Sequence, residues 1–193
     1  MILRTRRVIY GMRFFNKLKL YFKYLKKEKE LREFAIGLDS DVDFKKDLHI
    51  LFLDYDNVLL DEVEESVKEL QDFWNLSDCF LYKTKNGFHA YFYYDIMPYA
   101  RVRMIIDYAK YVDPMFKFIS KYYNYKTIRV AGKYSHKDIV FVKVIKGKRS
   151  PTFKEAELGD LKRREREYLL QIGDCLRKDM LKEETANFEK KQG

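Results

Sequence analysis

The feature that most constrains the fold is a pair of strand-like segments joined by an Asn-Gly turn. Residues Cys79–Lys83 and Phe88–Tyr94 are apolar and aromatic, as strands are, and Asn86-Gly87 stands between them. Asn-Gly is among the strongest short-range signals for a β-hairpin. A nearly apolar run at His49–Asp56 predicts a further, buried strand. The chain is therefore expected to build an antiparallel or mixed sheet.

Segments with helical periodicity surround these strands. Helices are predicted at residues 13–31, 62–74, 98–111 and 155–184, and further strands at residues 32–36, 126–131 and 139–145. No clean linker separates them, so residues 1–193 are predicted to form one α+β domain. Its core covers about residues 14–150, and a C-terminal helical extension covers about residues 153–186.

The composition excludes several other classes of protein. Hydrophobic residues make up 47% of the chain, including 16 Tyr and 15 Phe, so the chain is not disordered. Its apolar runs are shorter than the ~18–20 residues of a membrane span, so no integral membrane association is expected. Cys79, Cys175 and three histidines show no zinc-site spacing, so zinc is not expected. Without a disulfide framework or a signal-peptide pattern, an intracellular, cytoplasmic protein is predicted.

Charge is distributed in blocks along the chain. The formal net charge is +9, with basic excess in residues 1–32 and 117–149 and acidic excess in residues 39–72. Two basic blocks favour a polyanionic partner such as nucleic acid, and the acids between them favour a metal site. The alternative is that these blocks are simply solvated helix faces.

Asp54 and Asp56 are the sharpest local motif. On a strand, residues two apart point to the same face, so both carboxylates project together from the end of the predicted strand. Two adjacent carboxylates repel each other unless cations lie between them, and Mg²⁺ or Mn²⁺ suits such hard oxygen ligands. A pair of these ions supports phosphoryl or nucleotidyl transfer. Asp-x-Asp also occurs in other enzymes and in plain loops.

Two groups of residues have the chemistry of phosphate ligands. Thr84, Lys85 and His89 surround the Asn-Gly turn, where backbone N–H groups, a hydroxyl, an ammonium and an imidazole would together suit a triphosphate. The alternative is a hairpin whose histidine faces solvent. Basic residues also surround a second glycine turn, at Arg129, Lys133, His136 and Lys137. Taken singly, these are ordinary surface cations.

Asp113 is a candidate third carboxylate. It precedes Pro114, and the residue before a proline is pushed toward extended geometry, so Asp113 is expected outside a helix. The alternative interpretation is that Asp-Pro simply begins a helix.

The order of these motifs resembles that of the archaeo-eukaryotic primase superfamily. The closest likeness is to the small catalytic subunit of DNA primases and to plasmid or viral primase-polymerases. The resemblance runs over about residues 14–145, and it is carried by Arg32-Glu33-Phe34, Asp54-x-Asp56, Thr84-x-x-Gly87-x-His89, Val112-Asp113 and Arg129-x-x-Gly132 with His136 and Lys137 after it. It implies a primase-type core with an RRM-like sheet flanked by helices.

The resemblance also implies roles for single residues. It implies that Asp54, Asp56 and Asp113 hold two catalytic Mg²⁺ or Mn²⁺ ions, and that Thr84 and His89 contact the phosphates of the incoming nucleotide. Arg32 would be a further phosphate ligand. The segment from Asp113 to the arginine motif is longer than usual in the family, so Asp107 is an alternative third acid. The implied partners are nucleoside triphosphates, a single-stranded DNA or RNA template and a larger primase or replication subunit.

Two rival functions remain open at this point. Ile50–Leu60 also resembles the first motif of haloacid-dehalogenase-like phosphatases, in which the first aspartate is a covalent nucleophile. Gly173-Asp174 resembles their late motif, which needs a preceding buried strand, whereas residues 162–180 keep helical periodicity. The second rival is a nucleic-acid-binding module of primase fold without catalysis.

Overall fold

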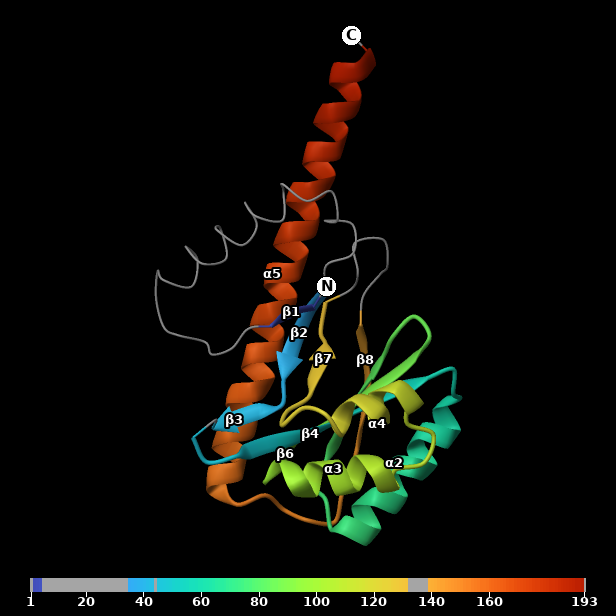
Figure 1. Ribbon diagram of the computed structural model, residues 1–193, viewed down its shortest axis with the longest axis vertical. Helices are drawn as coiled ribbons and strands as arrows, with labels where there is room; N and C mark the ends of the chain where they lie inside the picture. Colours follow the sequence, from blue (N-terminus) through green and yellow to red (C-terminus); the bar gives the residue numbers. More distant parts are fainter. Residues whose placement is uncertain (1, 5–34, 44, 132–138, 193) are drawn as a thin grey trace. The chain divides into compact units, whose positions relative to one another are not determined.

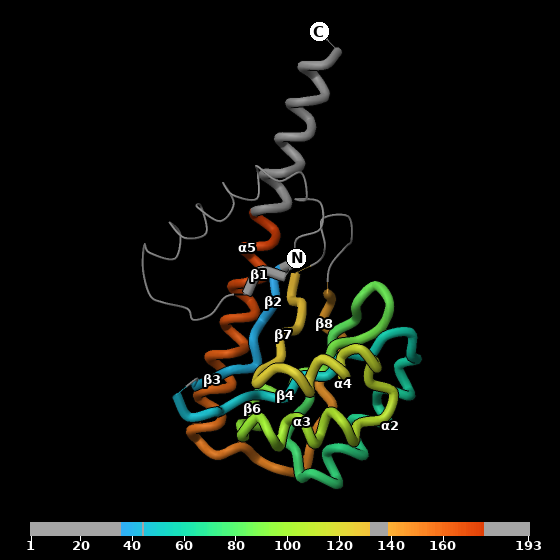
Figure 2. Tube along the Cα trace, in the orientation of Figure 1, coloured from blue at the N-terminus to red at the C-terminus, as the bar shows by residue number. Residues whose placement is uncertain are grey.

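The computed structural model describes residues 2–4, 35–43, 45–131 and 139–192 (Figures 1 and 2). The chain divides into two compact units. One unit contains Met1–Leu38, Arg129–Lys137 and Glu165–Gly193, and the other contains Asp39–Ile128 and Asp138–Arg164. The predicted helix at residues 13–31 lies outside the described residues.

A five-stranded antiparallel sheet forms the centre of the larger unit. Its strand order is β3-β4-β6-β5-β8. The strands are β3 (Asp41–Asp43), β4 (Leu48–Asp56), β5 (Cys79–Lys83), β6 (Gly87–Met97) and β8 (Val140–Ile145). The predicted hairpin is confirmed as β5-β6, and the predicted buried strand is confirmed as β4, in which residues 49–53 are all buried. The α+β class is thereby confirmed.

Four helices accompany the strands in the described part of the chain, and Figure 1 shows helices lying close together beside the large sheet. They are α2 (Leu60–Trp74), α3 (Tyr99–Tyr108), α4 (Pro114–Ser120) and α5 (Phe153–Gln192). Val63, Val67 and Leu70 bury the apolar stripe of α2. The hydroxyls of Tyr55 on β4 and Ser66 on α2 lie 3.2 Å apart, which fixes α2 on the Tyr55 face of the sheet. The helix predicted at 98–111 ends earlier, at Tyr108, and α4 matches the alternative in which Asp113-Pro114 begins a helix.

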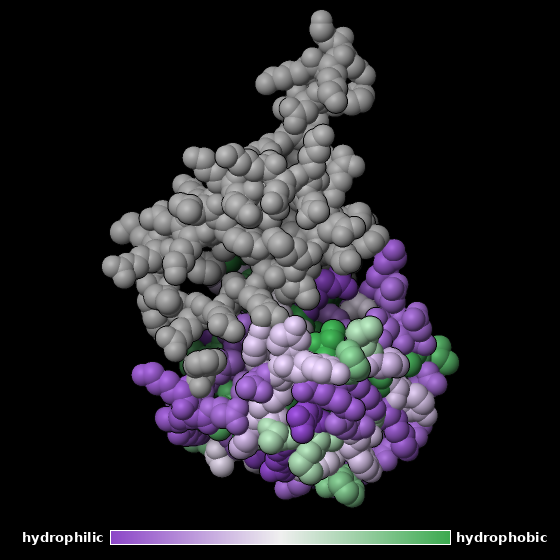
Figure 3. All heavy atoms as spheres, viewed as in Figure 1, coloured by the Kyte–Doolittle hydropathy of each residue, from purple (hydrophilic) through white to green (hydrophobic). Residues whose placement is uncertain are grey.

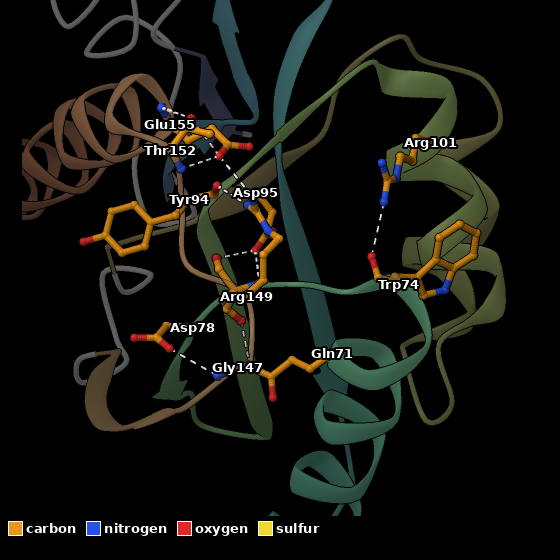
Figure 4. A network of polar contacts seen from close by, with 11 residues as sticks. Gln71, Trp74, Asp78, Tyr94, Asp95, Arg101, Gly147, Arg149, Thr152 and Glu155 are labelled. Atoms are coloured by element: carbon orange, nitrogen blue, oxygen red, sulfur yellow. Dashed lines mark hydrogen bonds and ion pairs between the residues drawn. The ribbon is translucent and has the colours of Figure 1, made fainter.

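A network of polar groups around the buried Asp95 ties the start of α5 to the sheet (Figure 4). The Asp95 carboxylate of β6 accepts hydrogen bonds from the Ser77 hydroxyl at 2.6 Å and from Arg149 Nη2 at 2.8 Å. Arg149 also donates to Glu155, in the first turn of α5, at 2.9 Å. Burial raises the pKa of the Asp95 carboxyl, while Ser77 and Arg149 oppose that effect. The network therefore fixes the connection from β8 to α5.

The smaller unit contains β1 (Ile2–Arg4), which pairs in parallel with β2 (Ala35–Asp39). After β7 (Thr127–Arg129), the backbone N–H of Val130 donates to the carbonyl of Ile36 at 2.8 Å. A Cβ at Gly173 of α5 would crowd the Cβ of Ala131, so the helix approaches that backbone closely. The strand predicted at 32–36 is described only from Ala35 onward.

None of the helices in the described part of the chain is long and apolar enough to cross a membrane.

Candidate functional site

Asp54 and Asp56 lie at the C-terminal end of β4, as predicted. Tyr55 between them is fully buried toward α2, whereas Asp54 is partly exposed and Asp56 is exposed. Strand alternation therefore gives the two carboxylates the face opposite Tyr55.

His89 lies directly opposite Asp54 on the neighbouring strand β6. Its Nε2 is 3.4 Å from Asp54 Oδ1, and the histidine side chain is 4% exposed against 26% for the aspartate. The histidine therefore does not face solvent. Its other ring nitrogen, Nδ1, is buried and has no hydrogen-bond partner among the described residues. Buried polar atoms are nearly always paired, so this ring is a polar group that folding alone leaves unsatisfied.

The turn between β5 and β6 is closed by its own residues. The Thr84 N–H donates to the Gly87 carbonyl at 2.9 Å, and the Gly87 N–H donates to Thr84 Oγ1 at 3.0 Å. Thr84 is buried, whereas Lys85 at the turn is exposed. A Cβ at Gly87 would fall on the carbonyl oxygen of Tyr55, so only glycine allows β6 to approach the end of β4 this closely. The turn thus places Lys85 beside the strand ends that carry Asp56 and His89.

Asp113 adjoins β4 through the backbone. Its N–H donates to the carbonyl of Asp54 at 2.8 Å. Its carboxylate caps α4, because Oδ1 accepts the N–H of Phe116 at 2.7 Å. The helix-start interpretation of Asp113 is therefore confirmed, and its backbone lies beside that of Asp54 in the first acidic motif. Asp107, the alternative third acid, is exposed on α3 with its Oδ1 3.9 Å from Lys121 Nζ.

Lys126 is a buried cation that the motif analysis missed. Its Nζ donates to the carbonyl of Phe116 at 2.6 Å and lies 3.9 Å from the centroid of the Phe116 ring. Burial lowers the pKa of Lys126 to about 8, while the charges of Asp54 and Asp113 act in the opposite direction. The sequence shows only one more lysine in a basic block, so nothing in it distinguishes this residue.

The remaining predicted phosphate ligands lie either outside the described residues or in the smaller unit. Arg32, Lys133 and His136 lie outside the described residues. Arg129, at the end of β7, is partly buried and belongs to the smaller unit. The candidate site around Asp54 therefore consists of residues of the larger unit.

The donor chemistry fits the Mg²⁺ or Mn²⁺ that the primase resemblance implies. Asp54, Asp56 and Asp113 offer hard carboxylate oxygens, and Asp54 and Asp113 adjoin. Within the part of the chain that the structure describes, no group of three or more His, Cys, Asp or Glu side chains is placed to hold a metal ion. Mg²⁺ at nucleotide sites is usually held by one or two carboxylates together with substrate phosphates and water. These residues fit a cation bound in that way.

No family model, curated protein or solved structure matches this chain. The likeness to primases therefore depends on the sequence motifs alone. The likeness to phosphatases loses its second motif, because Gly173-Asp174 lies inside the continuous helix α5 rather than after a strand.

Proposed function

We propose that this protein is a template-directed nucleotidyltransferase of the primase or primase-polymerase type, with a primase-type catalytic core. The observation that carries the proposal is the hydrogen bond from the Asp113 N–H to the Asp54 carbonyl. It joins the first and third acidic motifs, which are far apart in the sequence. The resemblance assigns both motifs to the catalytic metal site, and their contact supports that assignment.

The acids and the residues around them divide the work of such a reaction. Asp54, Asp56 and Asp113 would hold two divalent cations. When bound, the cations neutralise charge on the triphosphate and lower the pKa of the attacking 3′-hydroxyl. Lys126 offsets part of the negative charge of Asp54 and Asp113 from inside the protein.

The side chains at the hairpin turn suit the phosphates of the incoming nucleotide. Lys85 is exposed and supplies a positive charge, and His89 supplies an imidazole beside Asp54. The Thr84 hydroxyl accepts the Gly87 N–H and keeps its own proton for donation to a phosphate oxygen. Arg32, Arg129, Lys133 and His136 belong to the same proposal as further phosphate ligands.

The proposed partners follow from the same chemistry. Nucleoside triphosphates are the substrates, and single-stranded DNA or RNA is the template. The basic blocks at residues 1–32 and 117–149 would hold that template, so binding should weaken steeply as salt is added. A larger primase or replication subunit is the proposed protein partner, in an intracellular setting.

The test is primer extension and de novo synthesis by the full chain on single-stranded template with Mg²⁺ or Mn²⁺. Asp54→Ala and Asp56→Ala should each abolish nucleotide incorporation and leave template binding largely unchanged. Asp72→Ala is the matched control, because Asp72 is an exposed acid that pairs with Lys148 at 2.6 Å on the surface. The control should incorporate nucleotides like the wild type.

Each rival function predicts a different result in the same assays. A phosphatase would hydrolyse a small phosphomonoester without template and would lose that activity in Asp54→Asn. A non-catalytic module would bind single strands and show neither activity. Either result contradicts the proposed function.

A further inference from the structure

Large side chains are unusually exposed along α4 and the turn that follows it. Phe118 is 54% exposed and Tyr122 is 68% exposed. We call the whole set the α4 surface, and it consists of Met115, Phe118, Ile119, Tyr122 and Tyr123. Scattered apolar residues are normal on a protein surface, whereas a cluster of this kind usually marks a binding site. Figure 3 shows this face, where green and nearly white atoms lie among purple ones.

Two aromatic rings of the α4 surface contact each other. Phe118 and Tyr122 are four residues apart, and their ring centroids lie 4.9 Å apart with their planes tilted by 52°. Their exposure shows that this contact is not part of the core. The flat faces of such rings are available to other flat, apolar groups.

The segment that carries the α4 surface is basic. Residues 114–126 contain Lys117, Lys121 and Lys126 and no acid. Lys121 is the accessible cation, with its side chain 56% exposed and its Nζ 3.9 Å from Asp107. Lys117 instead donates to the carbonyl of Asp107 at 3.2 Å. An exposed ring pair beside an accessible cation fits a partner that carries both flat groups and negative charge.

A second exposed pair of rings offers a contrast. Phe73 and Tyr108 stack at 4.8 Å between α2 and α3, and the Tyr108 hydroxyl donates to the Glu69 carboxylate. Glu69 also lies 2.7 Å from Lys110 Nζ, so that ring pair is bonded to an ion pair through the Tyr108 hydroxyl. The α4 surface differs from it in that residues 114–126 contain lysines and no acid.

We propose that the α4 surface is a stacking platform for the unpaired bases of a single-stranded nucleic acid. Aromatic rings beside cations are the usual means of binding single strands without sequence preference. The platform begins directly after Asp113, whose N–H bonds Asp54, so a strand on it would lie next to the candidate site. This inference deepens the proposed function and rests on it for the role of the strand as template.

The experiment measures fluorescence anisotropy of a labelled oligothymidylate of about 20 nucleotides bound to the full chain, without metal or nucleotide. Phe118→Ala and Tyr122→Ala should each raise the Kd about 5-fold or more, as loss of one stacked base does. Tyr122→Phe keeps the ring and should bind like the wild type, whereas Tyr122→Leu should bind like Tyr122→Ala. Phe153→Ala is the matched control, since Phe153 is 88% exposed and belongs to α5.

A second measurement locates the base itself. Photocrosslinking of 5-iodouracil in the oligonucleotide should attach to Phe118, Tyr122 or Tyr123, as identified by mass spectrometry. Lys121→Gln should reduce the slope of log Kd against log salt concentration by about one. Unchanged thermal unfolding of the ring variants should accompany these results, because the rings are exposed.

Three results would overturn the inference. The first is wild-type affinity in both Phe118→Ala and Tyr122→Ala with crosslinks elsewhere. The second is equal binding by Tyr122→Leu and Tyr122→Phe, which would indicate apolar contact without stacking. The third is a change from dimer to monomer in the ring variants, which would assign the α4 surface to a second copy of the chain. A chain that binds strands through these rings but incorporates no nucleotide contradicts only the proposed function.

Discussion

The larger unit contains two clusters of charged side chains, one around Asp95 and one around Asp54, and their hydrogen bonding differs. Asp95 is buried, and its carboxylate accepts hydrogen bonds from Ser77 and Arg149 at distances of 2.6–3.2 Å (Figure 4). Asp54 is partly exposed, and its contact with His89 is longer, at 3.4 Å. The first carboxylate is satisfied by the fold itself, whereas the second retains capacity for a ligand.

The cations of the two clusters differ in the same sense. Burial lowers the pKa of the Arg149 guanidinium, but hydrogen bonds to Glu155 and Asp95 outweigh that effect and raise it. Burial lowers the pKa of the Lys126 ammonium, and the nearby charges of Asp54 and Asp113 do not restore it. The carboxylates beside Arg149 stabilise its charged form, whereas burial makes the charged form of Lys126 less favourable. Such costs are typical of functional sites.

Of the variants that test this comparison, Asp113→Asn should have the largest effect, which is on nucleotide incorporation. Asparagine caps helices about as well as aspartate, so thermal stability should stay close to that of the wild type. Nucleotide incorporation should fall by about 100-fold or more, as removal of one charge-stabilising group does in other enzymes. Steady-state incorporation and thermal unfolding of the same samples check both expectations.

Asp107→Asn is the control for this variant, because Asp107 is the exposed alternative acid on α3. It should remain active within about twofold, since surface changes are usually close to neutral. An inactive Asp107→Asn beside an active Asp113→Asn would reverse the assignment of the third acid. Full activity in both would remove Asp113 from the reaction.

The next largest effect is on stability and belongs to the other cluster. Arg149→Met leaves Asp95 buried without its cation, which should lower the free energy of unfolding by about 3 kcal/mol. Urea unfolding measures this change. Adding Asp95→Asn should recover part of the loss, because it removes the uncompensated charge.

Lys148→Met is the matched control, since Lys148 is 85% exposed and its pair with Asp72 lies on the surface. It should leave the unfolding curve almost unchanged. If Arg149→Met and Lys148→Met unfold alike, Asp95 is not the structural member of the comparison.

The sequence predicted best those elements that are determined by residues close together in the chain. The Asn-Gly turn fixes the β5-β6 hairpin, and the apolar run at residues 49–53 identifies β4. Once β4 pairs with β6, the alternation of side chains places His89 opposite Asp54. Asp54 and His89 therefore lie on strands that local patterns predict, whereas the pairing of β4 with β6 is itself a contact between distant segments.

The rest depends on contacts between distant segments. The bond between Asp113 and Asp54 joins residues from separate elements, and no local pattern encodes it. α4 has only seven residues, too few for a clear helical period. The burial of Lys126 depends on how that helix folds back, so the sequence shows a surface lysine where the structure has a buried one.

A pH dependence of stability tests Lys126. In the folded protein its pKa is about 8, against 10.5 as its usual value, so between these pH values the unfolded chain binds more protons than the folded one. The free energy of unfolding should therefore gain a contribution as pH rises from about 8 to about 10.5. Urea unfolding at several pH values, with a chelator present, should show this gain in the wild type relative to Lys126→Met.

Lys121→Met is the control, because it removes a nearby lysine whose side chain is 56% exposed, and it should retain the gain seen in the wild type. A constant difference between Lys126→Met and the wild type would mean that Lys126 is not a costly buried cation. Asp54→Asn sharpens the test further, since the charge of Asp54 raises the pKa of Lys126. Without that charge the pKa should fall, and the gain should begin at a lower pH than in the wild type. A gain that begins at the same pH in Asp54→Asn would separate Lys126 from the acidic site and leave Asp54 with His89 as its neighbour on β6.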